Sequence, residues 1–170
     1  LDDLLSGLQK SDLIICAGRP SMGKTALALS IARNAALEYG HRVGVFSLEM
    51  SNTQLVERLL TAEAKVDSHL VRTGKLPKNE WKRLAQAAGP LSEANIYIDD
   101  SASLNIMDLR AKARQLKAEK DVELIIVDYI QLLNSGGKVE SRQQEISLIS
   151  RSLKALAKDV NVPILAISQL

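Results

Sequence analysis

One loop in the sequence has the residue types and spacing needed to bind a chain of phosphates. Residues 18–25 read GRPSMGKT and match the pattern G-x-x-x-x-G-K-[ST] in full. The glycines allow backbone N–H groups to surround phosphate oxygens, while Lys24 would reach the β- and γ-phosphates and Thr25 would ligate Mg²⁺. A glycine-containing turn without a ligand is the alternative, but the Lys-Thr pair favours nucleotide binding. The expected phosphate contacts are Gly18, Arg19, Pro20, Ser21, Met22, Gly23, Lys24 and Thr25.

Three further polar residues follow apolar runs and could complete this site. Asp128 could hold the Mg²⁺ ion through its water shell, although an Asp after an apolar run is also ordinary turn chemistry. Glu49 could deprotonate the water that attacks the γ-phosphate, or it could be a solvated acid near a helix start. Gln169 could sense a γ-phosphate oxygen, but its position alone favours an ordinary polar residue at a strand end.

The positioning of these residues requires strands that end at one edge of a sheet. Apolar runs predict strands, and segments with helical periodicity separate them. The expected strands are 12–17, 42–47, 95–98, 123–127 and 162–168, and the expected helices are 25–39, 51–64, 105–120 and 142–159. Ser51 and Gln54 have the form of a capping box at one helix start. This alternation predicts an α/β fold with a mostly parallel sheet, whose ligands bind beyond the carboxyl ends of the strands.

Residues 66–90 interrupt the alternation of strands and helices. They contain Gly74, Pro77, Gly89 and Pro90, and they leave room for one short helix at about 78–88. No linker composition flanks the segment. We therefore expect a helical excursion within a single domain that covers residues 1–170.

Composition excludes several classes of protein. The chain has 170 residues, of which 46% are hydrophobic and 25% charged, and this excludes an intrinsically disordered protein. Its longest apolar run, 162–167, is far shorter than the ~20 residues of a membrane-spanning helix. The single cysteine, Cys16, excludes a disulfide framework and favours a cytoplasmic location. The net charge of +2 means that any contact with nucleic acid would be local, and the missing initiator Met favours a fragment.

Five segments together resemble one family of motor proteins. They are GRPSMGKTALALSIA (18–32), FSLEMS (46–51), LIIVDYIQLL (124–133), SRQQEISLISRSLKALAKD (141–159) and VPILAISQL (162–170). Many ATPases share the phosphate loop, but the combination resembles the RecA-like motor domain of the bacterial replicative DNA helicase (DnaB) family over essentially the whole chain. The resemblance implies a P-loop NTPase with a three-layer α/β/α sandwich. It also implies a hexameric ring that uses ATP to move on single-stranded DNA and to unwind the replication fork 5′ to 3′.

The resemblance also implies roles for individual residues. It gives Lys24 and Thr25 to the phosphates and Mg²⁺, with Lys24 and Glu49 as catalytic residues and Glu49 as the base. Asp128 would hold the metal, and Gln169 would link the nucleotide to the DNA-binding loop. A loop after Asp128 would face the central channel, so Lys138 and Arg142 are candidate contacts to DNA phosphates.

The resemblance further implies parts that lie outside this chain. These are an N-terminal domain that contacts primase, a linker helix, the main DNA-binding loop and the arginine finger of a neighbouring subunit, and a helicase loader is an implied partner. We therefore expect the 170 residues alone to bind ATP, to hydrolyse it poorly and not to unwind DNA. The alternatives are a small-molecule kinase, which shares the phosphate loop, and a ring-assembly module gated by nucleotide. No motif for contacting the base stands out.

Overall fold

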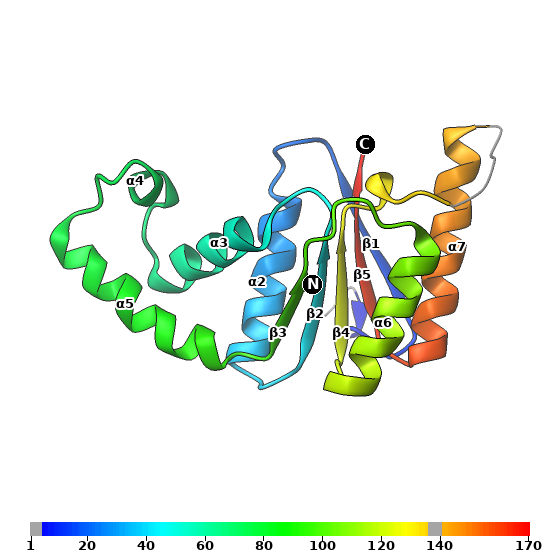
Figure 1. The fold of residues 1–170 in the computed structure, drawn as a ribbon, viewed down its shortest axis with the longest axis horizontal. Helices are drawn as coiled ribbons and strands as arrows, with labels where there is room; N and C mark the ends of the chain where they lie inside the picture. The colour runs from blue at the N-terminus through cyan, green and yellow to red at the C-terminus, as the bar shows by residue number, and fades with distance from the viewer. Residues whose placement is uncertain (1–4, 136–140) are drawn as a thin grey trace.

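A parallel β-sheet forms the centre of the protein. The computed structural model describes residues 5–135 and 141–170, and the sheet in these residues has five strands (Figure 1). The strands are β1 (Leu13–Gly18), β2 (Val43–Ser47), β3 (Ile96–Asp99), β4 (Leu124–Asp128) and β5 (Ile164–Gln169). They lie in the order β1-β5-β4-β2-β3, and every described pairing is parallel. The parallel sheet predicted from the sequence is therefore confirmed.

Helices cover both faces of this sheet and make the outer layers of the sandwich. The α-helices are α2 (Lys24–Leu37), α3 (Asn52–Ala64), α4 (Ser68–Arg72), α5 (Lys78–Glu93), α6 (Ile106–Lys120) and α7 (Arg142–Val160). Figure 1 shows α2 on one side of the sheet and α6 and α7 on the other. The predicted three-layer α/β/α arrangement is thus also confirmed. Within the described residues, no helix is both long and apolar enough to span a bilayer.

The central strands are apolar except near their carboxyl ends, because both of their faces are covered. All five residues of β4 are buried, and they alternate between two clusters of side chains. Ile125 and Val127 pack with α6 and α7, whereas Leu124 and Ile126 pack with α2 and α3. In β2, a Cβ atom on Gly44 would lie 2.6 Å from a methyl group of Leu116 on α6. Glycine therefore permits the close approach of α6 to the sheet.

Side chains cap α3, α6 and α7 close to the starts that the sequence predicts. The Ser51 hydroxyl accepts a hydrogen bond from the Gln54 N–H, and the Gln54 side chain accepts one from the Ser51 N–H, which confirms the capping box before α3. Asn105 accepts hydrogen bonds from the first turn of α6. Ser141 caps α7 in the same way, through the N–H of Gln144. These bonds satisfy N–H groups that have no partner inside a helix.

The segment that interrupts the alternation forms α4 and α5, which project from the side of the sheet that α3 covers (Figure 1). The sequence predicts a helix ending near Ala88, but α5 continues to Glu93 with Pro90 inside it. Pro90 lies in the last part of the helix, so its missing N–H removes only one hydrogen bond there. Leu84 and Ala87 of α5 pack with Ala64 of α3 in a small apolar cluster.

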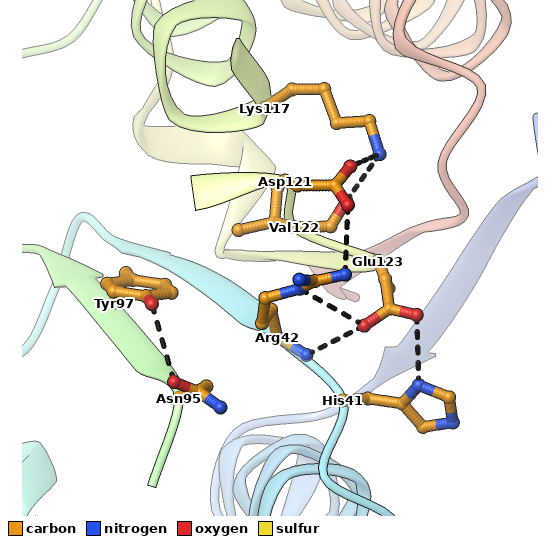
Figure 2. Close-up of polar contacts among 8 residues, drawn as sticks. All are labelled: His41, Arg42, Asn95, Tyr97, Lys117, Asp121, Val122 and Glu123. Atoms are coloured by element: carbon orange, nitrogen blue, oxygen red, sulfur yellow. Dashed lines mark hydrogen bonds and ion pairs between the residues drawn. The ribbon is translucent and has the colours of Figure 1, made fainter. Parts of the chain in front are cut away.

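Paired charges hold the amino edge of the sheet, where β2 and β4 begin (Figure 2). The Glu123 carboxylate lies 3.2 Å from the His41 ring and accepts a hydrogen bond from the Arg42 backbone N–H. Asp121 forms ion pairs with Arg42 at 2.9 Å and with Lys117 at 2.6 Å. The Arg42 backbone bond is the main reason that the pKa of Glu123 lies below its ordinary value. Bonding to Lys117 similarly lowers the pKa of Asp121.

Candidate nucleotide site

The carboxyl edge of the sheet carries the residues that the sequence singles out. Gly18 at the end of β1 pairs with Gln169 at the end of β5, and Ser47 at the end of β2 pairs with Asp128 at the end of β4. A cleft of about 590 Å³ opens at this edge. It is lined by Pro20, Ser21, Gly23, Lys24, Thr25, Ala26, Glu49, Met50, Gln54, Arg58, Asp128, Tyr129, Ile167 and Gln169. The parallel topology therefore brings distant parts of the sequence to one cavity.

The loop before α2 has the geometry of an anion site. Gly23 has a φ of 82° and occupies the N-cap position, a left-handed conformation that glycine adopts without strain. Since Gly23 has no side chain, the N–H groups of the first turn are free of an N-cap side chain and can face phosphate oxygens. The Lys24 ammonium donates hydrogen bonds to the carbonyls of Gly18 and Arg19, each at 2.7 Å. An ammonium has three N–H donors, so one remains for a phosphate oxygen.

A direct hydrogen bond joins the phosphate loop to the tip of β4. The Thr25 hydroxyl donates to a carboxylate oxygen of Asp128 over 2.7 Å, although 103 positions separate the two residues. Asp128 is only 4% exposed. Burial raises the pKa of Asp128 above its ordinary value, and the nearby carboxylate of Glu49 adds to the rise. The folded chain therefore holds a carboxylate whose negative charge is poorly solvated.

These oxygens fit a magnesium ion. Mg²⁺ prefers oxygen ligands and usually keeps several waters while binding one or two carboxylates and substrate phosphates. The adjacent oxygens of Thr25 and Asp128 match that preference, and a cation would stabilise the buried charge of Asp128. No group of three His, Cys, Asp or Glu side chains suited to a metal occurs in the described part of the chain. The other ligands would accordingly be phosphate oxygens and water.

Glu49 reaches the cleft because the chain turns sharply after β2. The hydroxyl of Ser47 donates to the carbonyl of Met50 at 2.7 Å and accepts from its N–H at 3.2 Å. The N–H of Leu48 donates to the carbonyl of Asp128 at 2.7 Å, so the turn stays attached to the tip of β4. Glu49 itself is exposed and lines the cleft. Its carboxylate is therefore accessible to water on the same side of the sheet as Lys24 and Asp128.

Sequence reasoning missed six residues that line the cleft. They are Ala26, Met50, Gln54, Arg58, Tyr129 and Ile167. Gln54 and Arg58 are four positions apart on α3, which places them on one side of the helix. The capping box fixes where α3 begins, but nothing in the sequence shows that this side of α3 faces the cleft. Arg58 adds a second positive charge to the cleft, and this charge partly opposes the rise in the pKa of Asp128.

Other predicted residues lie beside the cleft or outside the described residues. Gly18 and Arg19 contribute main-chain carbonyls that hold Lys24. The Met22 side chain is 73% exposed and does not line the cleft. Lys138 lies outside the described residues. Arg142 begins α7, where its guanidinium pairs with Glu145 and donates to the carbonyl of Gln131; this arrangement does not test the predicted DNA contact.

Comparison with known proteins identifies the family of the chain. A sequence model described as the DnaB-like helicase C-terminal domain matches residues 1–170. The chain belongs to this family. Replicative DNA helicase DnaB of Geobacillus stearothermophilus is 53% identical over 171 residues, and the match covers 100% of this chain and 38% of that protein. The chain therefore spans less than two fifths of this curated relative.

Solved structures of related proteins share the fold. The ATPase domain of G40P matches with a TM-score of 0.90 and 31% identity, over 99% of this chain and 61% of that chain. A DnaB-like replicative helicase, studied together with its interactions with primase, matches with a TM-score of 0.88 and 31% identity. That match covers 96% of this chain and 40% of the helicase chain. The sandwich described above is accordingly the RecA-like ATPase fold of these helicases.

Proposed function

We propose that this chain is the ATP-hydrolysing motor core of a replicative DNA helicase. The observation that carries the proposal is the hydrogen bond of 2.7 Å between Thr25 and Asp128, which joins the phosphate loop after β1 to a buried acid at the end of β4. That pairing is what a magnesium-dependent nucleotide site requires. The family assignment favours this function over a small-molecule kinase or a ring-assembly module.

In this proposal six cleft residues have defined tasks in ATP hydrolysis. Lys24 contacts the β- and γ-phosphates, while Thr25 and Asp128 hold Mg²⁺, which neutralises charge on the phosphates when it is bound. Glu49 orients the attacking water and accepts its proton. Gln169 hydrogen-bonds to a γ-phosphate oxygen. Arg58 supplies further positive charge to the same cleft.

The proposed activity of the whole protein extends beyond these residues. We propose that it forms a homo-hexamer, moves along single-stranded DNA and unwinds the replication fork 5′ to 3′, with primase and a helicase loader as partners. The relatives named replicative DNA helicase and the solved helicase studied with primase support this proposal. Because the chain spans 38% of the Geobacillus protein, we expect the 170 residues alone to bind ATP but to hydrolyse it slowly and not to unwind DNA.

An ATPase assay with and without DNA tests the proposal. The assay uses the full-length protein, meaning a chain of the relatives' length that contains these residues. Hydrolysis of Mg²⁺-ATP should increase when single-stranded oligothymidylate is added, and a forked duplex should be unwound. A rate that single-stranded DNA leaves unchanged, but that a small-molecule phosphate acceptor increases, would favour the kinase instead.

A further inference from the structure

The side chain of Gln131 holds the end of β5 through three hydrogen bonds. Gln131 lies in a short 3₁₀ helix, η1 (Ile130–Leu132), which directly follows Tyr129. Its amide nitrogen donates to the Ser168 hydroxyl and to the Gln169 carbonyl, each at 2.8 Å. Its amide oxygen accepts from the Gln169 N–H at 3.1 Å. Both backbone polar groups of Gln169 are therefore bonded to one side chain.

These bonds replace a missing stretch of strand pairing. The register between β4 and β5 ends where Val127 pairs with Ala166, because the chain leaves the sheet after Asp128. No residue of β4 in the described structure pairs with Gln169, so the Gln131 side chain takes the place of a strand partner for its N–H and C=O groups. On its other side, Gln169 lies beside Gly18, the residue where the phosphate loop begins, and the Leu170 N–H donates to the Gly18 carbonyl at 3.2 Å. Gln131 and Gly18 thus hold the end of β5 from both sides.

Strand geometry then sets the direction of the Gln169 side chain. Side chains alternate along a strand, so Ile167 and Gln169 face one way and Ser168 faces the other. Ile167 and Gln169 line the nucleotide cleft, whereas Ser168 points towards Gln131. A rotation of the β5 end would turn the Gln169 amide out of the cleft.

Gln131 is also bonded on its main chain to the beginning of α7. The Arg142 guanidinium donates to the carbonyl of Gln131 and pairs with Glu145 one turn along the helix. Glu145 in turn accepts a hydrogen bond from the Ser135 N–H at 3.0 Å. A continuous set of polar contacts therefore runs from the first turn of α7 through Gln131 to Gln169.

We propose that Gln131 is a positioning residue that keeps the Gln169 amide aimed into the nucleotide cleft and couples its orientation to the first turn of α7. This inference rests on the proposed ATPase function. A residue that only stabilised the sheet would change the melting temperature without a selective effect on turnover. A positioning residue changes the rate of the chemical step while leaving nucleotide binding intact, because Lys24 and Thr25 still hold the phosphates.

Kinetics of Gln131→Met in the full-length protein test the proposal. Met has a similar length but lacks both amide groups, so all three side-chain bonds are lost. We expect the KM for ATP to stay within about twofold and the kcat stimulated by oligothymidylate to fall about tenfold, since small misplacements of a reacting geometry are costly. Gln115→Met is the matched control, because the Gln115 side chain donates a hydrogen bond to Glu119 on the surface of α6, and it should leave kcat unchanged.

A double variant separates positioning from a general structural role. In a Gln169→Ala background, Gln131→Met should cause no further loss of kcat, because its effect passes through Gln169. An unchanged kcat in the single variant, or an equal loss in both backgrounds, would overturn the inference. If Gln131→Met does not fold, Gln131→Glu, which replaces the amide N–H donors with a charged carboxylate oxygen, is measured with the same expected outcomes. Absence of DNA-stimulated hydrolysis in the unmodified protein would instead refute the proposed function, and this inference with it.

Discussion

Acidic side chains at the amino and carboxyl edges of the sheet have pKa values that are shifted in opposite directions. At the amino edge, Asp121 and Glu123 are bonded to basic groups, and their pKa values lie below the ordinary range. At the carboxyl edge, Asp128 is buried, faces the carboxylate of Glu49 and has a raised pKa. One edge satisfies its charges within the chain, whereas the other would be stabilised by an added cation. The contrast shows which edge the fold prepares for a ligand.

The largest expected effect comes from removing the cation of the phosphate loop. Lys24→Ala should weaken ATP binding by about a hundredfold or more, because charge-assisted hydrogen bonds to phosphate are lost. Isothermal titration of the chain with Mg²⁺-ATP measures this. Lys117→Ala, at the amino edge, is the matched control and should leave the affinity unchanged. Undiminished affinity in Lys24→Ala would remove Lys24 from the site.

Replacement of the proposed base should separate binding from hydrolysis. Glu49→Gln in the full-length protein should keep ATP affinity and reduce kcat by about 10²–10⁴-fold, the range that general-base catalysis contributes. Steady-state hydrolysis and nucleotide titration measure the two quantities. Glu123→Gln makes the same chemical change at the amino edge and should not alter kcat. Near-normal turnover in Glu49→Gln would show that another group accepts the proton.

Asp128→Asn should lower activity but raise stability in magnesium-free buffer. Because the pKa of Asp128 is raised from its ordinary 3.8, the folded state binds this proton more tightly than the unfolded state. The free energy of unfolding therefore falls as pH rises from the ordinary to the raised pKa, and this loss of stability remains at neutral pH. The Asn side chain keeps an oxygen for Thr25 but has no charge to bury.

Thermal melting at several pH values tests whether Asp128→Asn raises the stability of the fold. At neutral pH without Mg²⁺, Asp128→Asn should melt above the unmodified chain, while stabilisation by Mg²⁺-ATP should be weaker. Asp121→Asn is the control from the opposite edge, and it should not raise the melting temperature, since its carboxylate is paired with Lys117 and Arg42. A lower melting temperature for Asp128→Asn under these conditions would contradict the assigned electrostatics.

The smallest expected effect concerns the paired amino edge. The pKa of Glu123 is lowered, so its bonds to Arg42 and His41 stabilise the fold above the ordinary pKa of 4.5 and are lost as pH falls through the lowered value. Glu123→Gln should reduce the free energy of unfolding at neutral pH by about 0.2–1 kcal/mol, as for exposed ion pairs. Urea unfolding at pH 7 and pH 3 measures this difference, which should shrink at the lower pH.

The sequence predicts the strands, the main helices and several residues of the candidate site, because local patterns encode them. Apolar runs locate the buried strands, and the rule that ligands bind beyond their carboxyl ends places Glu49 and Asp128 near the phosphate loop. Each of these signals lies within a few consecutive residues. The capping box at Ser51 is likewise a local pattern, and the structure confirms it.

Contacts that depend on how elements cross could not be predicted in this way. Arg58 lines the cleft from within α3. Gln131 reaches Gln169 because β5 extends two residues beyond the position opposite the end of β4. No local pattern distinguishes these side chains from other polar residues on helices. The continuation of α5 through Pro90 was also missed, because proline is normally read as the end of a helix.

The glycine in β2 limits how this protein can be engineered. A β-branched residue at position 44 would suit an isolated strand better, yet its first side-chain atom would overlap Leu116 of α6. To accept it, α6 would have to move outward or Leu116 would have to adopt another rotamer. The same strand leads into Ser47 and the turn that carries Glu49, the proposed base, so packing of α6 against Gly44 lies directly beneath the candidate site.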